Sequence, residues 1–206
     1  CVFNIYGYTI ALDFVTDNDF NYTDLSMPES YFVYTINGDE VTITGYNGTL
    51  PNNTVIPAMI QGKYVTHIAA DAFKNCTQIS EVNLTYLKSI GDNAFAGCTN
   101  LVRVNTSNLL TIGANAFAGC TALQDVYFPN ITEIKEYALY KCSALLSVTL
   151  GQSINSIGEY AIGYDYINNE SVVIPVFMLY GYADTIAQEY ATSNNITFEA
   201  IFNPLK

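Results

Sequence analysis

Apolar residues recur through the middle of the chain with a regular 22-residue period. An isoleucine occupies the same place in four successive segments, and a fifth follows one position late; these are Ile68, Ile90, Ile112, Ile134 and Ile157. An Ala-Phe or Ala-Leu pair and then a cysteine follow each of the first four, the cysteines being Cys76, Cys98, Cys120 and Cys142. Since so short a unit cannot bury its own apolar side, neighbouring units must stack around one continuous core.

A second pattern follows each cysteine. The phrase Leu-x-x-Val-x-Leu, with some substitutions, occurs at residues 79–84, 101–106, 123–128 and 145–150. Its last four positions alternate between inward and outward as a strand requires, which is the pattern of a leucine-rich repeat. The sequence therefore predicts a leucine-rich-repeat solenoid, of the α/β type but mostly β. Each repeat should give one strand of a parallel sheet and a short helical turn around the Ala-Phe pair.

Both ends of the repeat array carry patterns typical of caps. Residues 34–46 alternate around Asn37-Gly38, a pair that tolerates the positive φ angles of a tight turn, which predicts a β-hairpin. Residues 183–193 have apolar side chains at helical spacing, and residues 196–201 alternate like a strand. We therefore divide the chain into an N-terminal segment without an assigned role (1–30), a β-hairpin cap (31–53), the leucine-rich repeats (54–175) and a helix-plus-strand cap (176–206).

The repeat motif resembles that of a known family. The tandem phrase x-Ile-x-x-x-Ala-Phe-x-x-Cys-x-x-Leu-x-x-Val-x-Leu is similar to the BspA-like leucine-rich repeats of many bacterial and some protist cell surfaces, over about residues 54–175. Residues 34–46 resemble the hairpin with which such arrays begin, and residues 179–187 resemble their C-terminal cap. The resemblance implies adhesion or ligand capture outside the cell and no chemistry.

The charge of the chain limits its partners. Acids outnumber bases 19 to 7, for a net charge of -12, and the excess lies in residues 1–62 and 164–206. Binding to a phosphate backbone needs clustered Lys and Arg, so the balance of charges excludes nucleic acid as a partner. The sequence has no run of about 18 apolar residues, and we expect no direct membrane insertion.

The start of the chain bears on its location. It begins at Cys1, without a Met and without a basic segment followed by an apolar one, which indicates a trimmed precursor. We expect an extracellular or cell-surface protein from which a signal sequence has been removed. A lipid anchor at Cys1 and a plain boundary of the sequence remain alternatives, and the boundary is the simpler one.

The four repeat cysteines raise the question of a metal site or disulfides. Zinc ligands typically come in pairs close together in the sequence, and no two cysteines here are so close. Equivalent side chains of stacked repeats point in parallel, whereas a disulfide needs converging Cβ vectors. We therefore expect buried free thiols, and the sequence indicates no cofactor.

Catalytic and calcium-binding patterns are weak. His67 is the only histidine, and no serine or zinc hydrolase motif accompanies it, so the sequence predicts a protein that is not an enzyme. Asp17, Asp19 and Asn21 begin like a calcium loop. Tyr22 then stands where the loop needs Gly, so an ordinary polar loop is favoured over calcium.

The outward row of the predicted sheet is the candidate binding surface. The residues on either side of each strand valine point away from the core and form two rows: Glu81, Arg103, Asp125 and Ser147, and Asn83, Asn105, Tyr127 and Thr149. Arg103 should pair with both acids beside it, and Tyr127 resembles a contact anchor among short polar neighbours. The leading hypothesis is protein-protein adhesion with an extracellular protein ligand. A structural spacer of a larger surface protein and a glycan-binding module are the alternatives.

Overall fold

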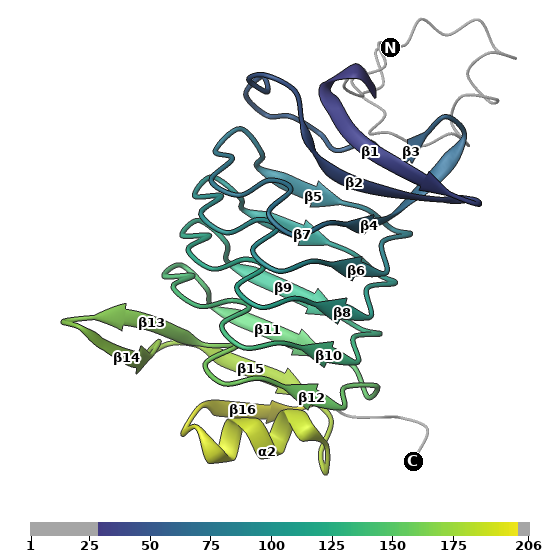
Figure 1. The fold of residues 1–206 in the computed structure, drawn as a ribbon. Coiled ribbons are helices and arrows are strands. Elements are labelled where there is room, and N and C mark those ends of the chain that lie inside the picture. Colours follow the sequence, from purple (N-terminus) through teal and green to yellow (C-terminus); the bar gives the residue numbers. More distant parts are fainter. Residues whose placement is uncertain (1–28, 202–206) are drawn as a thin grey trace, which may run out of the picture.

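A parallel β-solenoid forms the body of the molecule, as the 22-residue period predicts. A computed structural model describes residues 29–201. One strand of each repeat belongs to a six-stranded sheet, whose strands stack in sequence order along the long axis (Figure 1). These strands are β5 (Glu81–Asn83), β7 (Arg103–Asn105), β9 (Asp125–Phe128), β11 (Ser147–Leu150), β15 (Met178–Gly181) and β16 (Thr197–Ala200).

A second sheet runs beside the first. Its eight strands are β1 (Phe32–Asn37), β2 (Glu40–Tyr46), β3 (Met59–Ile60), β4 (Lys63–Ile68), β6 (Ser89–Ile90), β8 (Thr111–Ile112), β10 (Glu133–Ile134) and β12 (Ser156–Ile157). The repeat isoleucines pair in parallel register, Ile90 with Ile68 and with Ile112. The sequence predicted one strand per repeat but not this second one, because its strands in the repeats are too short to show alternation.

The third side of the solenoid consists of turns, and the helical turn expected around Ala94 and Phe95 is wrong. Asn93 has a φ of 55°, which interrupts any right-handed helix. The N–H groups of Ala94, Ala96 and Cys98 bond to carbonyls three positions back, as in successive β-turns. The N–H groups of Asn93 and Phe95 point along the axis instead. They donate to the carbonyls of Ala114 and Ala116 in the next repeat, at 2.8 and 2.7 Å. The turns therefore add a third ladder of hydrogen bonds along the axis.

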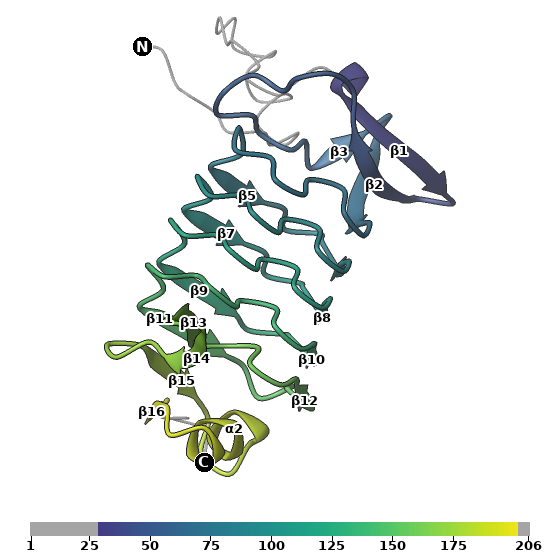
Figure 2. The same ribbon diagram turned by 60° about the vertical axis from the view of Figure 1, so that its left-hand side comes forward.

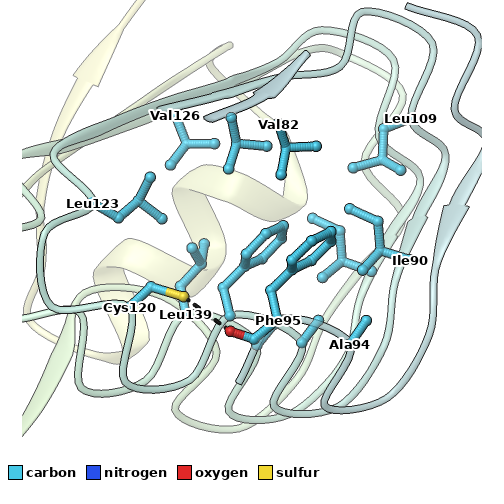
Figure 3. Packing of buried hydrophobic residues seen from close by; sticks show 14 of the residues in the cluster. Val82, Ile90, Ala94, Phe95, Leu109, Cys120, Leu123, Val126 and Leu139 are labelled. Atoms are coloured by element: carbon cyan, nitrogen blue, oxygen red, sulfur yellow. Dashed lines mark hydrogen bonds between the residues drawn. The ribbon is translucent and has the colours of Figure 1, made fainter. Parts of the chain in front are cut away.

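The core fills the space between these three sides. Figure 3 shows the strand valines on one side, Leu109 and Ile90 on a second, and Ala94 and Phe95 on the third. The phenyl rings of successive repeats stack, with centroids 5.3 Å apart for Phe73 and Phe95. The core phenylalanines are fully buried, so the rings form a continuous column beneath the turns.

Caps close both ends, as expected. The hairpin of β1 and β2 lies at the N-terminal end, and helix α2 (Ile186–Ser193) with β16 lies at the opposite end (Figures 1 and 2). The hydroxyl of Tyr190 on this helix donates to the carbonyl of Ile162 at 3.2 Å and accepts from its N–H at 3.1 Å. A short 3-10 turn, Glu29–Tyr31, precedes the hairpin.

An unexpected hairpin interrupts the last repeat. Strands β13 (Tyr164–Ile167) and β14 (Glu170–Val173) pair with each other and project from the side of the solenoid (Figure 1). The N–H of Ile174 donates to the carbonyl of Gly163 at 2.9 Å, which closes the base of the insertion. The next strand of the six-stranded sheet is consequently delayed beyond the repeat period, and Val148 pairs with Leu179.

Candidate functional site

The outward face of the six-stranded sheet brings together the eight residues that the sequence suggested. Pairing is in register along both rows, which run Glu81, Arg103, Asp125, Ser147 and Asn83, Asn105, Tyr127, Thr149. Each row continues into the C-terminal cap, the first with Met178 and Thr197 and the second with Tyr180 and Glu199. Sequence reasoning missed these four residues because the inserted hairpin breaks the 22-residue spacing.

Charged groups on this face are held by their neighbours. Arg103 Nη1 lies 3.0 Å from Glu81 Oε1. The second ion pair that we expected for Arg103 does not form, because Asp125 Oδ1 instead accepts a hydrogen bond of 2.7 Å from Ser147 Oγ. Both interactions are exposed, so each contributes about 0 to 1 kcal/mol to stability. Their main effect is to fix the positions of the side chains.

Tyr127 is the most exposed aromatic side chain on the face, at 61%. It borders a hollow of about 500 Å³ at the ends of β9 and β11, lined by Tyr127, Pro129, Thr149, Leu150, Gly151, Gln152, Ser153, Tyr182 and Ile201. The last two residues come from the C-terminal cap. No spacing in the sequence relates them to Tyr127, so the hollow could not be predicted.

His67 lies on the other sheet, away from this face. It is partly buried, its Nδ1 is 2.8 Å from Thr66 Oγ1, and it lies 3.9 Å from Glu40 Oε2. Lys88 also contacts this glutamate, and its hydrogen bond is the main reason why the pKa of Glu40 is lowered. The histidine therefore belongs to a small surface ion-pair cluster between β2, β4 and β6.

The repeat thiols are free and buried, as predicted. Cys98, Cys120 and Cys142 each donate from Sγ to the carbonyl of the core phenylalanine in the preceding repeat, at 3.1 to 3.2 Å. Burial raises the pKa of Cys98 to about 12 and raises that of Cys120 further still. Because the thiolate is the nucleophile and the metal ligand, these groups are chemically inert at neutral pH.

Within residues 29–201, no group of three or more His, Cys, Asp or Glu side chains is placed to hold a metal ion. In the same part of the chain, no helix has the length and apolar character needed to cross a membrane. Asp17, Asp19 and Asn21, the weak calcium alternative, lie outside the described residues.

The fold of the chain is similar to those of several solved leucine-rich-repeat proteins. The chain is 28% identical to a leucine rich repeat protein of T. pallidum, with a TM-score of 0.65 over 75% of this chain and 71% of that one. It is 19% identical to the pneumococcal vaccine antigen PcpA, with a TM-score of 0.55 over 79% of this chain and 44% of that one. A leucine rich cell surface protein from Faecalibacterium prausnitzii is 18% identical, with a TM-score of 0.46 over 73% of this chain and 59% of that one.

Comparison by sequence identifies the repeat type. A search of curated proteins gives no match. A family model described as a BspA type leucine rich repeat region matches residues 47–176 in six copies. This match spans more than half of the chain and includes residues 54–175, where the sequence places the repeats. The chain therefore belongs to the BspA-type leucine-rich-repeat family.

Proposed function

We propose that this chain is a non-enzymatic binding module, displayed on a cell surface or secreted, that engages an extracellular protein through the outward face of the six-stranded sheet. The observation that carries the proposal is Tyr127, a large aromatic side chain 61% exposed on a row of otherwise short polar side chains. Exposed aromatic residues on rigid elements are the commonest anchors of protein interfaces. Membership of the repeat family supports the location.

Rigidity of the face supports the same function. Strand β9, which carries Tyr127, is hydrogen-bonded to a neighbour on each side. The pair of Arg103 with Glu81 and the pair of Ser147 with Asp125 hold two further pairs of side chains in place. A preorganised surface loses little conformational entropy when a partner binds, which favours affinity.

The chemistry of the face supports binding over catalysis. Neither row contains a cysteine or a histidine, and His67 lies on the other sheet. The carboxylates of Glu81 and Asp125 each have a fixed partner on the surface. Nothing about these groups indicates a nucleophile with an adjacent base, which covalent catalysis requires.

Replacement of Arg103 and Tyr127 together by alanine tests the proposal. The full chain is first screened against a panel of extracellular matrix proteins, and the double variant is then compared on any protein that binds. We expect affinity to fall at least tenfold with an unchanged melting temperature, because both side chains are exposed.

Lys141 and Tyr166, a cation and a tyrosine away from the sheet face, provide the matched control for the double variant. Lys141 lies over the ring of Tyr166 at 4.3 Å beside the projecting hairpin, and alanine at both positions should leave affinity unchanged. Equal affinity of the Arg103 and Tyr127 double variant and the parent protein would contradict the proposal and move the site to the acidic caps. If no protein of the panel binds the chain, the alternative function as a structural spacer of a larger surface protein is favoured.

A further inference from the structure

The hollow beside Tyr127 has an unusual set of polar groups. Its lining includes Tyr127, Thr149, Ser153 and Tyr182, which carry hydroxyls, and Gln152, which carries an amide. Within residues 29–201, none of these five side chains takes part in a hydrogen bond or ion pair with another residue. In the first row of the same face, the side chains of Glu81, Arg103, Asp125 and Ser147 are paired.

The lining is neutral as well as unpaired. It contains no acid and no base, although the chain as a whole carries a net charge of -12. Its apolar surface comes from the rings of Tyr127 and Tyr182 and from Pro129, Leu150 and Ile201. Hydroxyls and amides can both donate and accept hydrogen bonds, so the lining suits a ligand whose own groups do both and carry no charge.

Three of the strands at the hollow offer no free edge to a peptide. β9, β11 and β15 each pair with a neighbour on both sides, whereas β16, which leads into Ile201, is the edge strand of the sheet within residues 29–201. An extended peptide needs a free edge for its main-chain hydrogen bonds. At β9, β11 and β15, recognition must therefore use side chains.

The floor of the hollow is held by close packing. A Cβ atom at Gly151 would overlap the carbonyl oxygen of Pro129, so only glycine allows the two chain segments to approach each other. The N–H of Gly151 also donates to the carbonyl of Phe128 at 3.1 Å. Gln152 and Ser153 follow this contact and are exposed. A volume of about 500 Å³ lies within the range of small-ligand sites.

The geometry points to a subsite for a neutral saccharide in this hollow, with a short oligosaccharide bound against the rings of Tyr127 and Tyr182. Sugar hydroxyls both donate and accept hydrogen bonds, and the C–H faces of a pyranose ring pack on aromatic rings. Gln152, Ser153 and Thr149 supply partners for those hydroxyls. The subsite extends the proposed protein-binding face and does not depend on it.

An array of oligosaccharides tests the inference on the full chain. The probes are neutral oligosaccharides of glucose, galactose, mannose and N-acetylglucosamine, with sialylated and sulfated oligosaccharides alongside. The variants are Gln152→Ala, Tyr182→Ala and Ser153→Trp, the last of which fills the hollow from an exposed loop position. Tyr166→Ala is the matched control, since this tyrosine is 45% exposed on the projecting hairpin.

We expect at least one neutral oligosaccharide to bind, with at least tenfold weaker binding to Ser153→Trp and to Gln152→Ala and unchanged binding to the control. The inference is overturned if no neutral oligosaccharide binds, if only acidic ones bind, or if Ser153→Trp binds as well as the parent. None of these variants changes the eight residues of the two rows. A negative result here thus leaves the protein-binding proposal to its own test.

Discussion

Thr106 is the residue that fits its environment least well. Its equivalents in the other repeats are Leu84, Phe128 and Leu150, all fully buried in the core. Thr106 is also fully buried, and its hydroxyl has no hydrogen-bond partner within the described residues. A buried hydroxyl without a partner costs about 1 to 3 kcal/mol. The repeat tolerates this cost because its other core positions remain apolar.

Replacing Thr106 with valine should therefore stabilise the protein. The substitution keeps the branched shape and removes the unpaired hydroxyl, so we expect the free energy of unfolding to rise by about 1 kcal/mol. Urea unfolding followed by circular dichroism measures the difference. Thr132→Val is the matched control, because that hydroxyl donates to the carbonyl of Leu110 at 2.8 Å and its loss should destabilise. A lower midpoint for Thr106→Val would contradict the argument.

The buried thiols make stability depend on alkaline pH. Folding raises the pKa of Cys98 to about 12 from a value near 9 in the unfolded chain. Above pH 9 the unfolded state therefore binds fewer protons than the folded state, and stability falls as the pH rises toward 12. Each such thiol contributes a loss of about 1.4 kcal/mol per pH unit in this window.

Urea unfolding at pH 8 and at pH 10 under reducing conditions measures the pH dependence of the unfolding free energy. Tyrosines also ionise in this range, so the comparison is between the parent and Cys98→Ala. We expect the fall in unfolding free energy between the two pH values to be about 1 kcal/mol smaller in the variant. Equal falls in the two proteins would show that this thiol ionises as readily when folded.

At the scale of elements, the 22-residue period was enough to predict one sheet and the core, and the patterns at residues 34–46, 183–193 and 196–201 predicted the caps. The period was not enough for the turns. Ala94 and Phe95 resemble the start of a helix by composition, but Asn93 adopts a left-handed conformation, which asparagine tolerates better than most residues. The equivalent residues of the other repeats, Asp71, Asn115, Tyr137 and Tyr160, also have a positive φ. Hydrogen bonding between repeats, which no single repeat reveals, decides the local conformation.

A pair of substitutions at Asn115 tests the role of this conformation. Its φ is 55°, which glycine adopts freely and a β-branched residue does not. We expect Asn115→Gly to leave the unfolding free energy within a few tenths of a kcal/mol and Asn115→Val to lower it by about 1 to 2 kcal/mol. Chemical denaturation of both variants provides the comparison. Similar midpoints would mean that the turn relaxes into another conformation.

The candidate site was only partly predictable for a related reason. Strand alternation places Arg103 and Tyr127 on the outward face without any knowledge of the third dimension. Tyr182 and Ile201 reach the same region only because the inserted hairpin delays β15 and the C-terminal cap folds back beside it. Contacts of this kind depend on the path of the chain, which periodicity does not describe.

At the scale of the whole molecule, each repeat contacts only its neighbours. The caps should therefore limit local unfolding at the ends of the array and have little effect on the middle. Tyr190→Phe tests this locality. Loss of its hydroxyl leaves the buried N–H of Ile162 without its partner, and we expect faster hydrogen exchange in the last repeat and the cap. Exchange at Phe95 and Phe117 should not change.

Hydrogen exchange followed by mass spectrometry resolves these regions. Tyr180→Phe serves as the control, since within residues 29–201 this hydroxyl makes no hydrogen bond and the substitution should leave every region unchanged. Faster exchange throughout the array in Tyr190→Phe would mean that the solenoid opens as one cooperative unit.

The ladders between repeats also determine how the molecule responds to force. The hydrogen bonds of both sheets and of the turns, such as that from the N–H of Phe95 to the carbonyl of Ala116, connect successive repeats along the long axis. Tension between the two ends therefore loads the repeat interfaces in series, so the weakest interface yields first. Each 22-residue repeat that opens lengthens the chain by about 70 Å. The solenoid should therefore extend stepwise under tension, one repeat at a time.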